Sequence, residues 1–462
     1  MNSTTDFTKG SISKVILKFY FPMLATAMLQ QFYTFADTMI VGRGLGDNAL
    51  AAVGNMSSLC FLIVGFSMGL ANGFSVLIAQ RFGEKNYSML RRTLFSMIIL
   101  SFGITALLTV LSTAFLKNTL ILLQTDEIIL NDSLLYGYII FGGLLASITY
   151  NVSAGILRSL GDSRTPLTAI ILSSVINIML DCFLIFVLRT GVGGAAAATV
   201  LSQVVSAAVC IRKLVSMDFL KMEKEERKFD AGISLKLLKN GVPMALMNSI
   251  TAVGCMVVQY FVNGLGVAFT SAYSVCSRYI NLFMQPACTA GYTISAFTGQ
   301  NYGAKEFGRI KGGLRVCLMI AGVSYLIFGS LMFFMPVRLA SILLSGEEQI
   351  AYASQFLPVC GIMLFAVDML FVYRSAVQSM GFPLVPMISG IVEMVLRIGA
   401  VSMLIGSLGF RATAFAEVCA WTGALVLNLI AFYSVFARER RNAVVHSTGQ
   451  THTRRYKTAY KG

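Results

Sequence analysis

Long apolar runs separated by short polar segments make up most of this chain. Each run reaches the roughly 20 mostly apolar residues that a helix needs to cross a hydrocarbon core about 30 Å thick. We therefore expect an all-α integral membrane protein of twelve transmembrane helices. The expected spans lie near residues 15–41, 48–78, 93–116, 132–157, 166–188, 192–211, 237–262, 268–298, 314–335, 351–377, 386–407 and 412–437.

The composition agrees with a chain that is mostly embedded in lipid. Hydrophobic residues make up 56% of the chain and charged residues only 12%, whereas a soluble domain carries about 25% charged residues. So few charges cannot cover a water-facing surface of this size, which excludes a soluble enzyme. The nine cysteines fall mostly inside spans, and both histidines lie near the C-terminus. We expect no disulfide framework, no metal cluster and, without a P-loop pattern, no ATPase.

The basic residues predict the orientation of the chain. If the N-terminus is inside, the cytoplasmic segments hold 28 of the 36 lysines and arginines, and the opposite loops hold 5. This asymmetry satisfies the positive-inside rule, and an even number of spans returns the C-terminus to the cytoplasm. We expect a multi-pass protein of the cell membrane. The net charge of +15 then reflects topology and not a nucleic-acid partner.

The sequence also compares well with itself at a shift of 220 residues. A sustained match across four helices is hard to obtain by chance. The aligned pairs include Gln80 with Gln300, Gly83-x-Lys85 with Gly303-x-Lys305, Ser159-x-Gly161 with Ser379-x-Gly381, Pro166 with Pro386 and, after one register slip, Pro22 with Pro243.

This repeat predicts two pseudo-symmetric six-helix lobes. Because each half has an even number of spans, both halves enter the membrane from the same side, as in parallel transporter repeats. We expect an N-terminal lobe at 1–214, a cytoplasmic linker at 215–236, a C-terminal lobe at 237–437 and a basic cytoplasmic tail at 438–462. Two such bundles around a central cleft can rock against each other, which favours a secondary transporter.

Four polar residues of the first half are expected at similar depth. Helix rise places Asp37 roughly 9 Å, Thr199 roughly 10 Å and Asp181 roughly 12 Å below the outer ends of their helices. Asn177 precedes Asp181 by four residues and shares its helix face. Acids in lipid are costly and mark function by default. Two carboxylates, an amide and a hydroxyl suit a sodium ion, and the carboxylates could instead carry a proton.

The alternative is that these acids are structural and cap helices or pair with basic residues. No Lys or Arg lies at their depth in the first half. In the second half, Val257 and Val401 occupy the repeat positions of Asp37 and Asp181, so the acid pair is not duplicated. Among the other intramembrane charges, Arg374 lies near Asp368 in the sequence, and we expect a structural i,i+4 ion pair between Glu393 and Arg397.

Four stretches carry a resemblance to a known family. They read FADTMIVGRGLGDNALAAVG at 35–54, GILRSLGDSRTPL at 155–167, NIMLDCFLIFVLRTGVGGAAAATVLSQ at 177–203 and SAFTGQNYGAKEFGRI at 295–310. Together they resemble the bacterial branch of the multidrug and toxic compound extrusion (MATE) family. The resemblance implies a V-shaped fold and export driven by a proton or sodium gradient.

The same resemblance implies functional residues. It assigns a cation site in the N-terminal lobe to Asp37, Asn177, Asp181 and Thr199, and it adds cavity or substrate candidates at Tyr136, Asn151, Gln259 and Asp368. Asn151 lies 15 residues beyond Tyr136 in the sequence, roughly 22 Å along a helix. We therefore expect it outside the acid cluster.

These observations favour a cation-coupled antiporter that exports drugs or other bulky, often cationic, organic compounds. We expect a monomer surrounded by lipid, with small-molecule substrates and with no cofactor beyond a coupling proton or sodium ion. The alternative is a flippase for lipid-linked oligosaccharides. It would need a cationic cavity, and the first-half spans carry no Lys or Arg that we expect to be buried. A receptor or scaffold would not explain a cluster of acids at one depth that is confined to one of the two repeats.

The orientation can be tested at the linker. A cysteine replacing Lys224, in a variant without native cysteines, should resist a membrane-impermeant maleimide in intact cells, because the basic linker stays in the cytoplasm. Labelling is measured before and after the cells are opened. Ready labelling of intact cells would overturn both the orientation and the span count.

Overall fold

The computed structural model describes residues 4–459, with side chains described up to residue 443. These residues contain no strand. The first half contains α1 (Ile12–Leu45), α2 (Asp47–Gly83), α3 (Tyr87–Leu122), α4 (Glu127–Gly142), α5 (Leu144–Ser159), α6 (Arg164–Asp181), the π-helix η1 (Cys182–Val187) and α7 (Val192–Val215). After the 3₁₀-turn η2 (Asp218–Leu220) follow α8 (Ala231–Asn263), α9 (Val267–Phe283), α10 (Gln285–Gly303), α11 (Phe307–Phe334), α12 (Pro336–Leu343), α13 (Glu347–Ser379), α14 (Leu384–Leu408) and α15 (Arg411–Ala459).

Within the described residues, ten helices are long and apolar enough to cross a membrane. The pair α4–α5, bent by 46° at Gly143, supplies an eleventh span. The interrupted pair α9–α10 occupies the position of the expected eighth span, so each of the twelve expected spans has a helical counterpart. The expected all-α fold is confirmed.

The structure differs from the expected spans in three details. Spans four and eight are each broken into two helices, and the short helix α12 was not expected. The linker is shorter than the expected 215–236, because α7 ends at Val215 and α8 begins at Ala231. The expected span began only at residue 237 because Lys236 and Lys239 lower the hydropathy of the sequence there. In the structure both lysines are exposed on the first turns of α8, where long basic side chains can reach the headgroup region.

The linker is held against the first half of the chain by an ion pair. Arg91 of α3 donates to both carboxylate oxygens of Glu226, at 2.6 and 2.7 Å. The same guanidinium donates to the carbonyl of Phe219 at 3.2 Å. This contact lowers the pKa of the Glu226 carboxyl to about 2.

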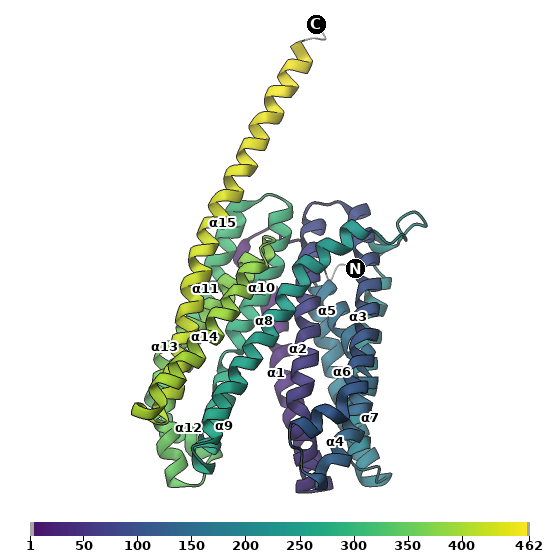
Figure 1. Cartoon of the computed structure of the whole chain (residues 1–462). Helices are drawn as coiled ribbons and strands as arrows, with labels where there is room; N and C mark the ends of the chain where they lie inside the picture. Colours follow the sequence, from purple (N-terminus) through teal and green to yellow (C-terminus); the bar gives the residue numbers. More distant parts are fainter. Residues whose placement is uncertain (1–3, 460–462) are drawn as a thin grey trace.

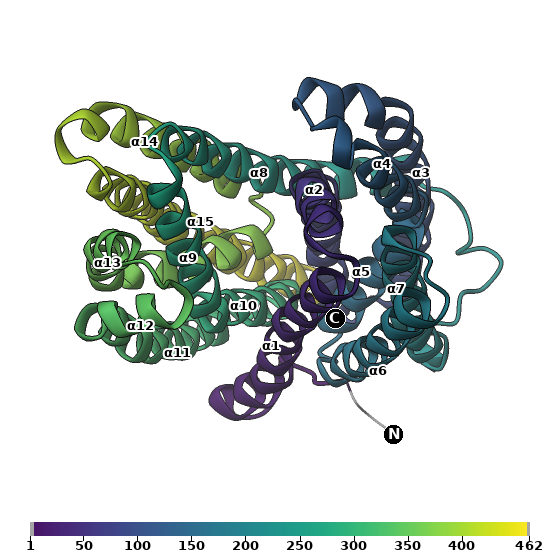
Figure 2. The same cartoon turned by 90° about the horizontal axis from the view of Figure 1, so that it is seen from below.

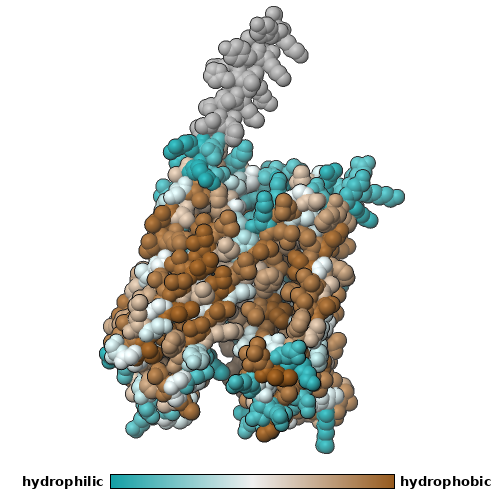
Figure 3. Space-filling model, in the orientation of Figure 1, coloured by the Kyte–Doolittle hydropathy of each residue, from teal (hydrophilic) through white to brown (hydrophobic). Residues whose placement is uncertain are grey.

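The helices form two groups, α1–α7 and α8–α15 (Figures 1 and 2). Both ends of the described chain lie on one side of the molecule, which we call the terminal side (Figure 1). Apolar side chains cover the middle of the surface, polar ones gather at both ends, and a hollow separates the two groups on the side opposite the termini (Figure 3). This arrangement is the V of two lobes that the sequence predicted.

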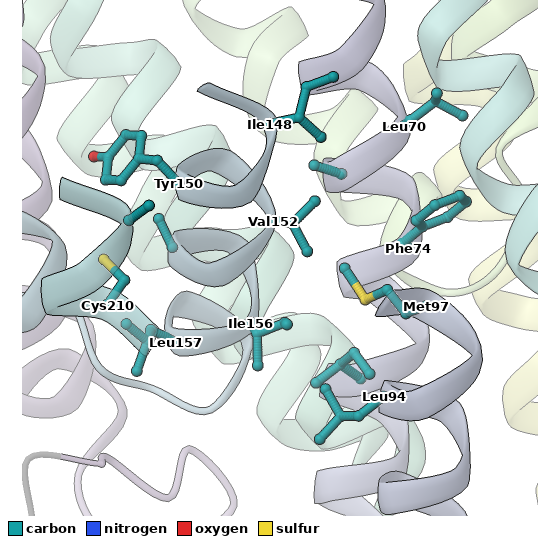
Figure 4. Packing of buried hydrophobic residues seen from close by; sticks show 14 of the residues in the cluster. Leu70, Phe74, Leu94, Met97, Ile148, Tyr150, Val152, Ile156, Leu157 and Cys210 are labelled. Carbon is teal, nitrogen blue, oxygen red and sulfur yellow. The ribbon is translucent and has the colours of Figure 1, made fainter. Parts of the chain in front are cut away.

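Each lobe has its own hydrophobic core. In the N-terminal lobe, Leu70 and Phe74 of α2 pack with Met97 of α3 and with Ile148 and Ile156 of α5 (Figure 4). In the C-terminal lobe, helices α8, α9, α13, α14 and α15 contribute to a separate cluster. Two independent cores allow each lobe to move as a unit.

The first halves of α1 and α8 cross to the opposite lobe. Phe19 and Met23 of α1 pack among residues of α10, α11 and α13, while Leu237 and Ala245 of α8 belong to the core of the N-terminal lobe. Each of these helices contains a proline, at Pro22 and Pro243 respectively. A proline inside a helix removes one backbone hydrogen bond and favours a bend.

Glycines allow α8 to lie directly on α2. A Cβ at Gly69 would stand 2.6 Å from the Cα of Ala245, and one at Gly73 would overlap the carbonyl oxygen of Asn240. Two glycines four residues apart let helix backbones approach closely in membranes. Asn248 adds a side-chain hydrogen bond to the carbonyl of Gly65 at 3.0 Å.

On the terminal side, a symmetric pair of contacts joins the lobes. Gln80 of α2 donates to the carbonyl of Ser379 at 2.9 Å, and Gln300 of α10 donates to the carbonyl of Ser159 at 2.8 Å. A Cβ at Gly83 would overlap the carbonyl oxygen of Gln300, and one at Gly303 would overlap that of Gln80. These contacts connect residues that the 220-residue shift aligns, and they close the terminal side.

The N-terminal segment reinforces this closure. The backbone N–H of Thr5 donates to the carbonyl of Gly161 at 3.1 Å, in the N-terminal lobe. Two residues later, the N–H of Phe7 donates to the side chain of Gln300 at 2.9 Å, and Arg309 donates to the Phe7 carbonyl at 2.8 Å. The segment therefore touches both lobes at the point where they meet.

The closure can be tested with Gly83→Ala. The added methyl group must push α2 away from α10, and overpacking of this kind costs about 1–3 kcal/mol. We expect a lower melting temperature for the purified protein in detergent. The matched control is Gly54→Ala on the same helix, where a Cβ meets no atom within 4 Å. Equal melting temperatures for the two variants would contradict the close contact.

Candidate functional site

The structure brings the four expected residues of the N-terminal lobe together. Asp37 of α1 and Asp181 of α6 lie within range of a side-chain hydrogen bond between their carboxyl groups. With its amide nitrogen turned toward the acid, Asn177 donates to Asp181 Oδ2 at 2.7 Å and accepts from the backbone N–H of Thr199 at 3.3 Å. Asn177 and Asp181 are fully buried. Three different helices therefore position one cluster of oxygen atoms.

The site has unused acceptor capacity. The Oδ1 atoms of Asp37 and Asp181 are buried and have no hydrogen-bond partner among the described residues. Two adjacent carboxylates also repel each other when both are ionised. A cation or a proton would satisfy these oxygens and reduce the repulsion, and no Lys or Arg in the part of the chain that the structure describes forms an ion pair with either acid.

Three further polar residues surround the acids. Tyr136 of α4 lies within electrostatic range of both acids, as the resemblance implied. Tyr33 and Ser202 were not expected. Tyr33 is one helical turn before Asp37, and its hydroxyl lies close to the side chains of Thr199 and Ser202. Both could have been predicted from the sequence, because residues three or four positions apart share a helix face. Tyr33 precedes Asp37 by four residues, and Ser202 follows Thr199 by three.

A π-helix follows the second acid. The turn η1 begins at Cys182, directly after Asp181, and ends at Val187. Wide turns of this kind are rare and occur frequently at functional sites. Ile185 of η1 packs with Val41 of α1 and Val192 of α7. The irregular turn therefore borders the acid pair on its outer side with apolar residues.

The remaining candidates lie away from the acid pair. Asn151 belongs to α5, beyond the bend at Gly143. Gln259 of α8 donates to Asn263 at 2.6 Å and lines the cavity between the lobes. Asp368 of α13 is fully buried, does not line that cavity and has no hydrogen-bond partner among the described residues.

The repeat positions of the acids in the C-terminal lobe are apolar, as expected. Val401 is fully buried and packs with Val258, Val262 and Ala414 in the core of that lobe. A closely packed apolar cluster leaves no polar ligands for a cation. The acid pair is therefore confined to one of the two lobes.

A cavity of about 600 Å³ lies between the lobes. Its walls come from α2 and α5 on one side and from α8, α9, α10, α13, α14 and α15 on the other. Trp421, the only tryptophan of the chain, forms part of the wall. The cavity has the size of many sites for drug-like ligands, which measure about 300–1,000 Å³.

A chain of ion pairs forms part of the cavity wall. Glu393 accepts from Arg397 at 3.1 Å, which is the expected intrahelical pair. It also accepts from Arg374 at 2.7 Å, so Arg374 pairs with Glu393 rather than with Asp368, its neighbour in the sequence. Arg397 continues the chain to Glu417 of α15 at 2.9 Å.

Two charged residues of this wall were not predicted from the sequence. Glu417 lies six residues after Arg411, inside the expected twelfth span, and the rule that flagged the other intramembrane acids applies to it equally. Arg158 was counted with a cytoplasmic segment, yet the structure places it in the cavity lining. Arg158 lies just beyond the expected fourth span and is partly exposed, so the expectation that the first-half spans hold no buried Lys or Arg did not cover this cationic group of the cleft.

The geometry defines a class of protein. Two helical lobes enclose a cavity that is closed on one side of the membrane and open on the other, and one lobe holds a buried pair of acids. This is the design of a secondary transporter with alternating access. The acids and the cavity occupy different places, because neither Asp37 nor Asp181 is among the residues that line the cavity.

Comparison with known proteins identifies the family. The MatE family model matches residues 22–183 and 243–401. Probable multidrug resistance protein YoeA of Bacillus subtilis (strain 168) is 30% identical over 367 residues, covering 77% of this chain and 79% of that protein. Probable multidrug resistance protein YpnP of the same strain is 27% identical over 381 residues, covering 81% and 84% respectively. The chain belongs to the MatE family of multidrug and toxic compound extrusion transporters.

A solved structure shares the same fold. It is an outward-facing conformation of a multidrug resistance MATE family transporter of the MOP superfamily, and it matches with a TM-score of 0.87. The match covers 95% of this chain and 99% of that one at 22% sequence identity. The V-shaped arrangement of twelve helices is thus the fold of this family.

The ion-pair chain can be tested with Glu393→Gln. Glu393 accepts hydrogen bonds from two buried arginines, and loss of one partner from a buried ion pair costs about 3–5 kcal/mol. We expect a marked drop in melting temperature, partly restored by adding Arg374→Gln. Glu347→Gln, at an exposed acid in the first turn of α13, is the control. A melting temperature unchanged by Glu393→Gln would rule out this role.

Proposed function

We propose that this transporter exports small organic compounds across the cell membrane in exchange for protons or sodium ions. The observation that carries the proposal is the pair Asp37 and Asp181, whose Oδ1 atoms are buried and have no hydrogen-bond partner within the described part of the chain. Buried acids of this kind in a membrane are usually functional. The names of the curated relatives, which refer to multidrug resistance, support drug-like compounds as the cargo.

The coupling follows from the position of α1. Its second half carries Asp37, and its first half packs in the core of the C-terminal lobe. A cation bound between Asp37 and Asp181 would remove the repulsion between the carboxylates and draw α1 toward α6 and α7. Because α1 contacts both lobes, this movement changes the wall of the cavity. By linkage, a cation that lowers the affinity for substrate is itself displaced by substrate to the same extent.

The proposal includes the orientation and the surroundings of the protein. The termini face the cytoplasm in accordance with the positive-inside rule, and the cleft then opens to the outside. The transporter works as a monomer in lipid and needs no cofactor beyond the coupling ion. Cation entry and substrate release then take place on the same outer side.

The position of Arg158 supports a second candidate function. The cavity contains cationic side chains from both lobes, as a flippase for lipid-linked oligosaccharides would need for a pyrophosphate headgroup. The family match and the names of the relatives favour the exporter. Transport of a soluble compound in vesicles separates the two functions.

The acid pair can be tested with Asp37→Asn in inverted vesicles. Asparagine keeps the size of the side chain but cannot carry the negative charge that holds a proton or sodium ion. We expect uptake of a fluorescent drug driven by an imposed gradient to be abolished, while expression and gel-filtration behaviour stay unchanged. Proton and sodium gradients are imposed separately, which also identifies the coupling ion.

The matched control for this experiment is Asp126→Asn. Asp126 caps α4 by accepting from the N–H of Ile128 at 2.9 Å, and asparagine caps helices equally well. This variant should transport normally. Full gradient-driven uptake by Asp37→Asn would contradict the assignment of the acid pair as the site of the coupling ion.

A further inference from the structure

The cavity between the lobes is lined by more positive than negative side chains. Three arginines contribute to its wall, Arg158 from α5, Arg374 from α13 and Arg397 from α14. Only two acids do so, Glu393 and Glu417. At neutral pH with all five groups ionised, the lining therefore has one positive charge in excess.

Each carboxylate oxygen of the two glutamates already accepts a hydrogen bond from a side chain of the wall. Glu393 Oε1 accepts from Arg397 at 3.1 Å, and Oε2 accepts from Arg374 at 2.7 Å. Glu417 Oε2 accepts from Arg397 at 2.9 Å, and Oε1 accepts from the hydroxyl of Tyr273 at 3.5 Å. All four carboxylate oxygens thus have a donor within the wall. Both carboxylates are therefore already paired with arginine, and an organic cation would have to compete with a guanidinium group for either of them.

The arginines, in contrast, retain donors without acceptors. Arg374 Nε and Arg397 Nη1 are buried and have no hydrogen-bond partner among the described residues, and these side chains are only 9% and 2% exposed. Arg158 is partly exposed and forms no ion pair in the described part of the chain. A buried donor without an acceptor is costly, so a ligand that supplies acceptor oxygens gains affinity here.

The rest of the wall suits an apolar or aromatic body. Met68 of α2, Met244 and Met247 of α8, Met284 and Trp421 line the same cavity. Methionine side chains adapt to ligands of different shape, and an indole ring stacks on planar compounds. The cavity therefore combines an adaptable apolar surface with a group of cationic donors.

We propose that the cleft takes organic compounds whose apolar or aromatic body carries a carboxylate or phosphate group, with that group bound by the cleft arginines. The planar guanidinium fork binds both kinds of anion with paired hydrogen bonds. This inference names the substrate class of the exporter and rests on the proposed function. The phosphate can belong to a soluble compound or to a lipid headgroup, and the experiment distinguishes these sources.

The test uses Trp421 as a native fluorescent probe in purified protein. Flavin mononucleotide and riboflavin share one ring system and differ by a phosphate group, so quenching of Trp421 reports both with the same chromophore. We expect flavin mononucleotide to bind about tenfold more tightly or better, because charge-assisted hydrogen bonds act only on the phosphate. Equal affinities for the two flavins would overturn the proposal.

Arg158→Gln connects this preference to the cleft. Arg158 forms no ion pair with any residue that the structure describes, so its replacement leaves the buried ion pairs of the C-terminal lobe intact. The variant should bind flavin mononucleotide about tenfold more weakly and riboflavin as before. Arg92→Gln, at an exposed arginine of α3 outside the cavity lining, should change neither affinity. A phosphate preference that survives Arg158→Gln would also overturn the proposal.

A further arm identifies the source of the anion. The same titration is made in nanodiscs of phosphatidylcholine with and without phosphatidic acid. Competition by phosphatidic acid supports a lipid phosphate as the ligand, and unchanged binding of flavin mononucleotide supports a soluble anion.

The proposed function and this inference can be tested separately. Binding in detergent needs no ion gradient, and Asp37 does not line the cavity. Asp37→Asn should therefore keep the preference for flavin mononucleotide. Loss of gradient-driven transport in Asp37→Asn together with an intact phosphate preference supports both conclusions. Loss of transport in that variant, combined with equal affinities of the unmodified protein for the two flavins, rejects only the substrate class.

Discussion

Backbone contact between α2 and α10 on the terminal side is the constraint on which the rest of this structure depends. Gly83 and Gly303 leave no room for a side chain, and Gln80 and Gln300 each donate to a carbonyl of the other lobe. In this conformation the helices meet so closely on that side that the lobes are separated only on the other. The V shape and the open cavity follow from this contact. Its residues come in pairs related by the internal repeat, so each lobe supplies the same groups to the other.

Helix α1 connects the two places where chemistry is expected. Its second half holds Asp37 beside Asp181, while Phe19 and Met23 in its first half pack in the core of the opposite lobe. A change of charge at the acids therefore acts on a helix that both lobes hold. Helix α8 crosses in the same way but carries Val257 at the corresponding position, so the repeat supplies two crossing helices and only one of them bears an acid.

Charge is divided unevenly between the two polar regions. Among the described residues, no arginine or lysine forms an ion pair with the acid pair, whereas both glutamates of the cavity wall are paired with arginine. The carboxylates of the acid pair thus have no fixed counterion from the described part of the chain, whereas those of the cavity wall do. Under the two proposals, a cation would bind at the acid pair and an anionic group at the cavity wall, so the two ligands would share no atoms.

The sequence by itself determined the membrane class, the spans, the two-fold repeat and the acid pair, because apolar runs, a constant shift and isolated acids are local patterns. Helix rise was sufficient to place Asp37, Asp181 and Thr199 at one depth. Only the tertiary structure decided that Arg374 pairs with Glu393, that Arg158 lines the cavity and that the repeated Gln and Gly residues meet each other. A pattern along the chain gives the depth of a residue and its face on a helix. It does not give the partner across a helix interface, which depends on how closely two backbones approach and how the lobes are rotated.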